Sequence, residues 1–430
     1  MTPISRRAWL RCVAHTAAVV VAAPTIIPAS ALGKDGRPSP SHRITPGMIG
    51  LGSMGLRHVK GFLQEYDCRI IAVCDVDAAR RQEALREIRQ VYDDDGCAQY
   101  NDFRELIARR DVDAVCISLP DHWHAIPVIM AARAGKDIYG EKPLALTVAE
   151  GRAMCEAVQQ SGCVWQTGSW QRSTWQFRFG AELVRSGRIG KLLRVEVGNP
   201  ETPTIGPQPP MPVPDGFDYE MWLGPAPWAP YTEKRCHWNF RWIYDYSGGQ
   251  ITDNGAHDID IAHWGMGCDD TGPVEVEGSG EFPTDGLWDV AIQHHVIARY
   301  ANGVEMHIGD RSRYPAGVRW IGDRGWVYVN RSGIQTEPKS LLREPFSGGM
   351  ARNLMDRQEH RRNFLDAIKT RAECIAPIEI AHRSITVAHL GNIAMRLGRK
   401  IRWNPDTEEI MNDPAATRML SVAYREPWKL

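Results

Sequence analysis

Three glycines near residue 50 have the spacing of a loop that binds the pyrophosphate of a dinucleotide. Gly50, Gly52 and Gly55 form Gly-x-Gly-x-x-Gly. Glycines in such a loop allow a tight turn and a close approach of phosphate, and a helix starting near Ser53 would stabilise the negative charge. The pattern alone is weak evidence, so its meaning depends on the surrounding elements. Pro46 precedes it where a strand is required, which predicts a short or irregular first strand.

A carboxylate follows the glycines at the distance expected for a ribose contact. Asp75 ends the apolar run 69–75, where its oxygens can accept hydrogen bonds from the adenosine ribose. This carboxylate favours NAD, because it would repel the 2′-phosphate of NADP; Arg80 and Arg81 leave NADP open. Asp75 could also cap the following helix, and the two roles are compatible.

The segments around these residues alternate between strand and helix patterns. Residues 69–75 and 111–120 are short apolar runs, whereas 78–92 and 125–134 have helical spacing, the latter ending before Gly135. This alternation predicts an α/β fold whose first domain is a Rossmann dinucleotide-binding domain, a parallel sheet with helices on both faces.

Composition excludes several classes of function. The chain has 430 residues, 43% of them hydrophobic, and a formal charge of -1, which argues against nucleic acid as the main partner. The ten cysteines show no zinc-binding spacing, so we expect no metal. The length suggests two domains.

The N-terminal residues resemble a twin-arginine signal peptide. Arg6 and Arg7 precede an apolar stretch, and the small residues 29–31 offer a cleavage site. Pro24 interrupts the apolar run well short of membrane-spanning length, so we expect removal rather than stable membrane insertion. The sequence thus predicts a signal peptide at 1–31, a linker at 32–43 and export to the periplasm.

Two longer motifs identify a family resemblance. PDHWH (residues 120–124) and AGKDIYGEKP (134–143) resemble the glucose-fructose oxidoreductase / inositol dehydrogenase / MocA (Gfo/Idh/MocA) family of nicotinamide-dependent sugar and polyol oxidoreductases. The similarity continues through QTGSWQRS (166–173), the glycine-containing stretch 240–264 and the closing YREPW (424–428). It covers nearly all of the chain after the predicted signal and is similar to a branch with many exported bacterial members.

The resemblance implies two domains and an oligomeric assembly. We expect a Rossmann NAD-binding domain at 44–168 and a C-terminal α+β domain at 169–430, which would bind substrate and support a dimer or tetramer. The C-terminal domain should contain a large mixed, mostly antiparallel sheet. Strand-like composition marks the segments 192–198, 274–282, 290–300, 304–310 and 326–330.

The resemblance also implies a catalytic trio. Lys142 lies in the Glu-Lys-Pro motif, and Asp253 and His257 match an Asp-x-x-x-His motif. Oxidation of a secondary alcohol needs a base for the hydroxyl proton, which suits His257. The ammonium of Lys142 can stabilise charge on the reacting oxygen, and Asp253 can orient the imidazole or a substrate hydroxyl from the same helical face or a neighbouring turn.

Contacts to cofactor and substrate complete the expected site. The predicted cofactor contacts are Gly50, Gly52, Ser53, Met54, Gly55, Asp75, Leu119, Pro120, His122, His124, Glu141 and Lys142. Aromatic faces stack well on sugar rings, and polar side chains between tryptophans suit a polyhydroxylated ligand. The predicted substrate contacts are Trp170, Gln171, Arg172, Arg241 and Asn254.

Three functions follow from these residues. The first is an NAD(P)-dependent sugar or polyol dehydrogenase; the second is an NAD-cycled glycoside hydrolase or lyase that forms a transient keto-sugar. The third is a non-catalytic sugar-binding module. The intact Lys142, Asp253 and His257 favour the first. Since an exported enzyme has no pool of soluble NAD, we expect a tightly bound cofactor that is recycled inside the site.

Overall fold

The structure is a computed structural model, which describes residues 38–39, 42–343 and 357–430. Residues 44–430 form one unit. The predicted signal peptide at 1–31 lies outside the described residues, as does most of the predicted linker at 32–43. No helix within the described ranges combines the length and apolarity needed to span a bilayer.

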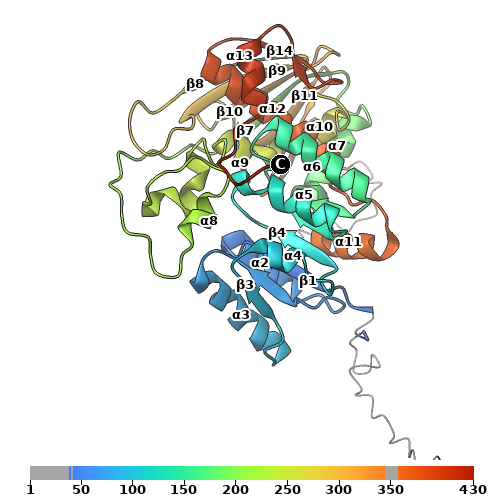
Figure 1. Ribbon diagram of the computed structural model, residues 1–430. Helices are drawn as coiled ribbons and strands as arrows, with labels where there is room; N and C mark the ends of the chain where they lie inside the picture. The colour runs from blue at the N-terminus through green and yellow to red at the C-terminus, as the bar shows by residue number, and fades with distance from the viewer. Residues whose placement is uncertain (1–37, 40–41, 344–356) are drawn as a thin grey trace, which may run out of the picture. The chain divides into compact units, whose positions relative to one another are not determined.

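A six-stranded parallel sheet forms the first half of the unit that begins at Ile44 (Figure 1). Its order is β3-β2-β1-β4-β5-β6, the order of dinucleotide-binding folds. The strands are β1 (Pro46–Ile49), β2 (Ala72–Cys74), β3 (Ala98–Tyr100), β4 (Ala114–Ile117), β5 (Asp137–Gly140) and β6 (Trp165–Thr167). The connecting helices are α2 (Ser53–Phe62), α3 (Ala78–Tyr92), α4 (Phe103–Ile107), α5 (Ala125–Arg133) and α6 (Val148–Ser161). The predicted Rossmann fold is confirmed.

The first strand is short, as Pro46 predicts. β1 has four residues, begins at Pro46 and pairs in parallel with β2 and β4. Proline has no N–H to donate, so it is tolerated at the first position of an internal strand but not further along. Ile44 forms an isolated parallel bridge with Cys68 two residues before Pro46, so the pairing is irregular at this point, and the strand delivers the chain to Gly50.

A nine-stranded mixed sheet forms the second half. Its order is β13-β12-β11-β7-β10-β9-β8-β14-β15, and only the β7–β10 pairing is parallel among those between its described strands. The strands are β7 (Leu192–Asn199), β8 (Glu275–Glu281), β9 (Gln293–Arg299), β10 (Glu305–Asp310), β11 (Gly317–Gly322), β12 (Trp326–Asn330), β13 (Gly333–Glu337), β14 (Ile401–Asn404) and β15 (Glu409–Ile410). The predicted mostly antiparallel sheet is confirmed, and sequence patterns missed the strands β11, β13, β14 and β15.

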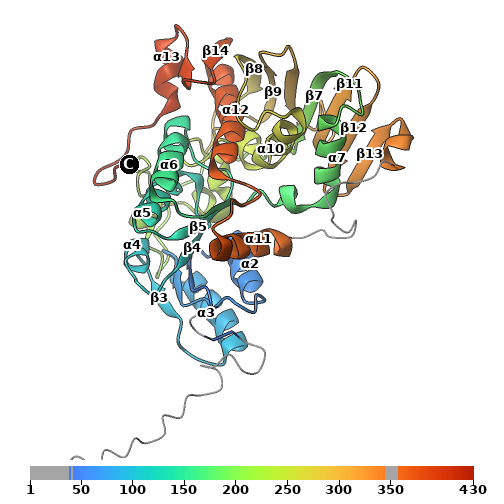
Figure 2. The same ribbon diagram turned by 90° about the vertical axis from the view of Figure 1, so that its right-hand side faces the viewer.

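Helices cover one face of this sheet (Figure 2). α7 (Trp175–Arg185) packs on β12, α10 (Gly255–Met266) on β7 and β11, and α12 (Ile378–Leu397) on β8 and β9. The strands alternate buried and more exposed residues, as β9 illustrates. Such alternation is typical of a sheet with one face packed on a core.

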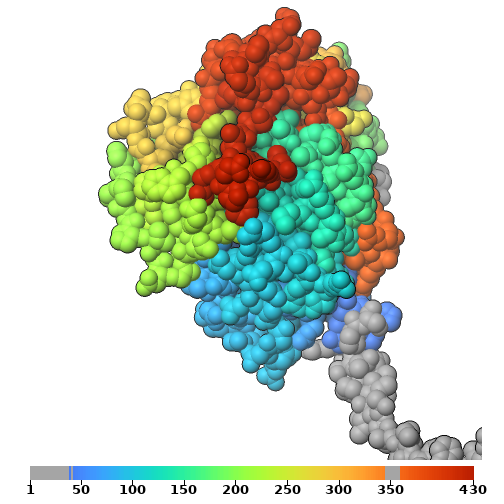
Figure 3. All heavy atoms as spheres, viewed as in Figure 1, coloured from blue at the N-terminus to red at the C-terminus, as the bar shows by residue number. Residues whose placement is uncertain are grey.

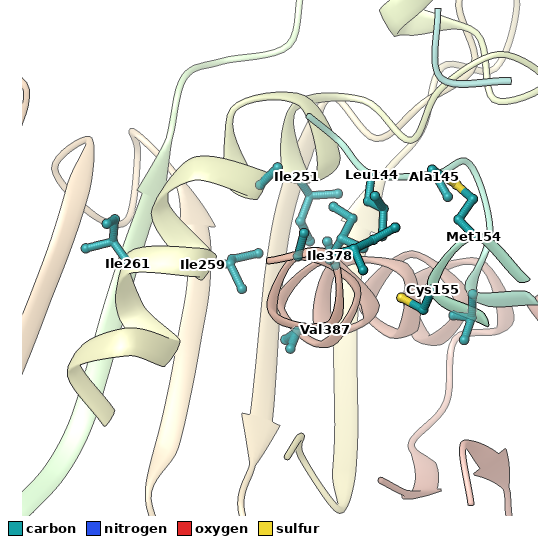
Figure 4. Packing of buried hydrophobic residues seen from close by; sticks show 14 of the residues in the cluster. Leu144, Ala145, Met154, Cys155, Ile251, Ile259, Ile261, Ile378 and Val387 are labelled. Carbon is teal, nitrogen blue, oxygen red and sulfur yellow. The ribbon is translucent and has the colours of Figure 1, made fainter. Parts of the chain in front are cut away.

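One core joins the two halves. Figure 4 shows Ile251 and Ile259 on one side of α12, and Met154 and Cys155 of α6 on the other, with Ile378 between them. These side chains belong to a single buried cluster. The Rossmann half and the C-terminal half therefore form one compact unit from residue 44 onward.

Candidate active site

A cavity of about 500 Å³ opens at the carboxyl ends of the Rossmann strands. Ligands of open parallel sheets bind at this edge. One wall carries the glycine loop and the ends of β2, β4 and β5, and the other comes from the C-terminal half. Of the predicted site residues, those that line it are Gly50, Gly52, Ser53, Met54, Asp75, Leu119, Pro120, Glu141, Lys142, Trp170, Arg241, Asp253, Asn254 and His257.

The glycine loop is shaped for close approach of a phosphate. Gly50 has φ +84°, and a Cβ there would lie 2.3 Å from the Ser118 carbonyl oxygen. A Cβ on Gly55 would lie 1.9 Å from the Gly50 oxygen. At Gly52, which lines the cavity, the same atom would meet only the Arg80 guanidinium, at 3.0 Å. The loop is therefore a bare backbone cradle at the start of α2, which fits the pyrophosphate of NAD.

Asp75 is held rigidly beside this cradle. Its Oδ2 accepts a hydrogen bond from the Leu51 N–H at 2.7 Å, and its Oδ1 accepts from the Asp77 N–H at 2.9 Å. Burial raises the pKa of the carboxyl. Each carboxylate oxygen can accept more than one hydrogen bond, so Oδ1 and Oδ2 of Asp75 can still accept hydrogen bonds from ribose hydroxyls.

Lys142 and Asp253 meet in the lining of the cavity. Lys142 follows β5, and its Nζ donates to Asp253 Oδ1 at 2.7 Å and to the Asp253 carbonyl oxygen at 2.9 Å. The Arg241 Nε donates to Asp253 Oδ2 at 3.1 Å. Burial opposes ionisation of Asp253, but the two neighbouring cations outweigh it and hold the pKa of this carboxyl below its ordinary value. The cluster contains two cations and one carboxylate.

A buried pair anchors the residue before the lysine. Glu141 Oε1 lies 2.7 Å from His58 Nε2, and both side chains are buried. Burial alone would favour the neutral acid, yet the contact with His58 lowers the pKa of Glu141. The Lys142 N–H donates to Glu141 Oε2 at 3.2 Å. His58, which the sequence did not single out, therefore helps to fix the backbone that presents Lys142.

His257 reaches the same cavity from a second helical turn. Asp253 ends the short helix α9 (Gln250–Asp253), and His257 lies in the first turn of α10. Asn254 separates the helices, so the two residues occupy neighbouring turns. The His257 ring is buried and lies edge-on to Trp170, with ring centroids 6.2 Å apart.

Asp121 is an unpredicted acid in the cavity wall. It is 3% exposed, and Ser247 Oγ donates to its Oδ2 at 2.5 Å. Burial, with a smaller contribution from the negative charge of Asp253, raises the pKa of Asp121 to about 7. The PDHWH segment thus supplies the site through its aspartate.

The histidines of that segment have structural partners instead. His122 Nε2 lies 3.1 Å from the Trp222 carbonyl oxygen, and His122 does not line the cavity. His124 Nδ1 lies 2.7 Å from the Pro143 oxygen, and its Nε2 lies 2.8 Å from the Leu119 oxygen. Both rings are buried. The predicted cofactor contacts Gly55, His122 and His124 thus do not line the cavity: His124 holds the loop that carries Lys142, and Gly55 lies behind the glycine loop.

Arg172 corrects the predicted substrate contacts. Its guanidinium is 2% exposed and donates to Asp260 Oδ2 and to Asp269 Oδ1, each at 2.8 Å. Gln171 is also buried, with its amide beside the His257 carbonyl oxygen and Arg331. Sequence spacing placed both near a ligand, but both point into the protein.

Two residues that line the cavity were not predicted from the sequence: His237, in the irregular stretch before α9, and Arg331, in the turn between β12 and β13. Trp238 lines the cavity as well. Trp238 is 59% exposed at the rim, and its ring lies 4.2 Å from the Arg241 guanidinium carbon. No periodic pattern marks such positions. In the described ranges no cluster of three or more His, Cys, Asp or Glu side chains has a metal-binding arrangement.

Comparison with known proteins gives matches over both halves. Residues 44–169 match "Oxidoreductase family, NAD-binding Rossmann fold", and residues 205–430 match "Oxidoreductase family, C-terminal alpha/beta domain" of the same GFO_IDH_MocA group. Myo-inositol 2-dehydrogenase from Thermotoga maritima is 26% identical over 335 residues, 75% of this chain and 86% of that protein. The scyllo-inositol 2-dehydrogenase (NAD(+)) of Bacillus subtilis is 26% identical over 241 residues, 56% of this chain and 58% of that protein.

A solved structure shows the same fold. The WlbA dehydrogenase from Bordetella pertussis, in complex with NADH and UDP-GlcNAcA, superposes with a TM-score of 0.63. The two chains are 17% identical, and the match covers 84% of this chain and 99% of that one. This likeness concerns the fold alone.

Proposed function

The chain belongs to the Gfo/Idh/MocA oxidoreductase family and has its NAD-binding Rossmann domain, and we propose that it transfers a hydride between NAD and a carbon bearing a secondary hydroxyl in a sugar, glycoside or inositol-like polyol. The observation that carries the proposal is the contact of Lys142 with Asp253 in a cavity that the glycine loop also lines. A cationic group for the reacting oxygen thus lies in the same cavity as the cofactor cradle.

The residues of this chain divide the work of the reaction. NAD, held by the glycine loop and Asp75, would supply the hydride acceptor. His257 takes up the hydroxyl proton as the general base. Lys142 stabilises the negative charge that develops on the substrate oxygen, and Asp253 holds the ammonium in place. In the reverse direction His257 returns the proton.

The named relatives direct the choice of substrate. Two of them act on myo-inositol and scyllo-inositol according to their names, so these polyols are the first to test. Trp170 and Trp238 give the cavity aromatic faces, which suit the C–H face of a sugar ring. Methyl glycosides extend the test to pyranosides.

The experiment is incubation of the purified enzyme with NAD and each inositol or glycoside. A dehydrogenase forms a ketone and NADH in equal amounts. Release of the aglycone would support an NAD-cycled hydrolase or lyase, and sugar binding without either product would support a binding module. The Lys142→Ala variant serves as the negative control in every reaction.

Export and cofactor retention form a linked part of the proposal. The pattern in residues 1–31 supports a twin-arginine signal, periplasmic localisation and membership of the exported branch. NAD would then load during cytoplasmic folding and be recycled by alternate oxidation and reduction of substrates. Fractionation of cells that express the chain, with Arg6 and Arg7 replaced by Lys as a control, tests the localisation. A wild-type protein that is purified free of nucleotide and turns over only with added NAD would contradict recycling.

We also propose that the protein is a dimer or tetramer. The support is the broad second sheet, whose helices cover one face. Light scattering at several protein concentrations measures the state directly, and a monomer mass throughout would contradict it.

A further inference from the structure

Residues 213–246, here called the bridging segment, cross from the C-terminal half to the Rossmann sheet. The Ala78 N–H donates to the Gly216 oxygen at 2.9 Å, and the Asp218 N–H donates to the Val76 oxygen at 3.0 Å. In Figure 3 the yellow-green atoms of this region lie against the blue atoms of the Rossmann half. Both hydrogen bonds involve residues that directly follow β2. The bridging segment therefore bounds the cavity beside Asp75.

These two backbone hydrogen bonds form an isolated antiparallel bridge between Asp77 and Phe217. A side-chain contact adds to it, because the Asn101 Nδ2 donates to Asp218 Oδ2 at 2.8 Å. Phe217 belongs to a buried aromatic cluster of the bridging segment, against which Val76 packs. The end of the cavity that would hold adenosine is therefore bounded by groups from both halves of the chain.

Arg80 and His237 make the most direct link across this end. The Arg80 Nη2 donates to His237 Nδ1 at 2.5 Å. Burial and the charge of Arg80 lower the pKa of His237 to about 4, so the ring is neutral and able to accept this bond at neutral pH. The other terminal nitrogen of the guanidinium, Nη1, lies near Gly52, 3.0 Å from where a Cβ would stand. Arg80 is thus placed between the pyrophosphate cradle and the bridging segment.

The backbone at His237 is held in an uncommon conformation. Its φ is +55°, in the left-handed region that non-glycine residues seldom adopt. Its ring also packs on Phe217, with centroids 5.2 Å apart. The surrounding contacts maintain a local strain that a loose surface loop would relieve.

We propose that His237 is a cofactor-retaining residue, which fixes Arg80 beside the glycine loop and closes the bridging segment over the adenosine end of the cavity, so that bound NAD leaves slowly. NAD release would require the Arg80–His237 bond to break and the bridging segment to open. The inference rests on the tight NAD binding proposed above and is independent of which sugar or polyol reacts.

The test is the rate at which NAD leaves the protein. His237→Gly removes the imidazole without straining the positive φ. Loss of a hydrogen bond to a charged group should raise the release rate about tenfold or more. Release is followed by rapid dilution of the loaded protein with an enzyme that consumes free NAD, and retained nucleotide is quantified after gel filtration. Neither readout needs substrate.

A matched control separates the effect of losing the Arg80–His237 contact, here called the latch, from the effect of a more flexible backbone. Lys234→Gly introduces the same glycine three residues earlier, where the lysine side chain is 42% exposed and lies beside Glu233. This variant should release NAD at the wild-type rate. His237→Asn tolerates the left-handed φ but has a shorter side chain, so it should also release NAD quickly and serves if the glycine variant does not fold.

The outcomes are distinct. Fast release by both His237 variants, with normal release by Lys234→Gly, supports the latch. Release from a folded His237 variant within about twofold of wild type overturns it, because a charge-assisted bond contributes more than that. If wild-type protein itself loses NAD at once, retention fails and the latch with it, while hydride transfer with added NAD would leave the dehydrogenase proposal intact.

Discussion

The ammonium of Lys142 donates to two oxygens of a single residue, Asp253, at 2.7 Å to Oδ1 and 2.9 Å to the main-chain oxygen. The contact joins the end of β5 in the Rossmann half to the end of α9 in the C-terminal half. Because it uses a backbone oxygen as well as a carboxylate, the position of Lys142 depends on the fold of α9 and not only on the charge of Asp253.

Replacement of Lys142 by Ala should abolish most of the hydride transfer and leave NAD bound. The loss of one charge-stabilising group at the reacting oxygen lowers kcat by about 10²- to 10³-fold in comparable sites. Stopped-flow absorbance of NADH formation measures the rate, and nucleotide content measures binding. Lys60→Ala, an exposed lysine paired with Glu87, is the control and should behave as wild type. Survival of full activity in Lys142→Ala would refute the role assigned here.

Two glycines of the loop should respond differently to Ala. Gly55→Ala places a Cβ 1.9 Å from the Gly50 oxygen, so the backbone must move, and we expect a loss of folding stability of at least about 2 kcal/mol. Gly52 has φ -65° and meets only the mobile end of Arg80, so Gly52→Ala should fold normally. Its Cβ would instead obstruct the pyrophosphate and raise the Kd for NAD. Thermal unfolding measures the loss of stability, and NAD titration measures the Kd. If the two variants had the same stability and the same Kd for NAD, the predicted difference between the two glycines would be wrong.

Arg172 should be a stability residue rather than a substrate contact. Arg172→Met leaves Asp260 buried without its cation, which costs about 3–5 kcal/mol in comparable buried pairs. The double variant Arg172→Met/Asp260→Leu removes both charges and should recover much of that loss. Urea unfolding gives the stabilities, and KM should change little in whichever variants remain folded. A large increase in KM with unchanged stability would restore the substrate-binding interpretation.

The difference between wild type and an Asp121 variant in the pH dependence of stability should report on Asp121, because burial also raises the pKa values of Glu150 and Asp258 to about 7. The pKa of Asp121 is raised to about 7 in the folded protein, so between about pH 4 and 7 the folded state holds a proton that the unfolded chain has lost. Stability therefore falls as pH rises through this window, and the penalty is constant above it. Asp121→Asn removes the titration and keeps an oxygen for Ser247. The variant should be more stable than wild type by up to about 4 kcal/mol near pH 8, and equal to it near pH 4.

Unfolding midpoints measured from about pH 4 to 8 give this comparison. Asp406→Asn, at an exposed position, should leave the wild-type pH profile unchanged. If Asp121→Asn shows the same fall in stability with pH as wild type, the raised pKa of Asp121 does not cause that fall and the prediction is wrong.

The sequence alone determined the order of the elements and the cofactor cradle. The helix predicted at 78–92 coincides with α3, because apolar spacing is a local signal. Its N-cap is Asp77, whose side chain accepts from the Ala79 N–H, and not Asp75 as the sequence suggested. The Gly-x-Gly-x-x-Gly loop was equally readable, since its function depends on backbone geometry that only glycine supplies. Lys142, Asp253 and His257 were found through family motifs, and the structure brings all three to one cavity.

Only the tertiary structure decided which polar residues face that cavity. Arg172 and His124 stand in motifs beside site residues, yet carboxylates or carbonyl oxygens from distant segments hold both inside the protein. Asp121 and His237 reach the cavity through pairings with Ser247 and Arg80, 126 and 157 residues away in the chain. Local patterns record backbone conformation and burial periodicity. The direction of a polar side chain is set by partners that folding brings from elsewhere, and so it could not be read along the chain.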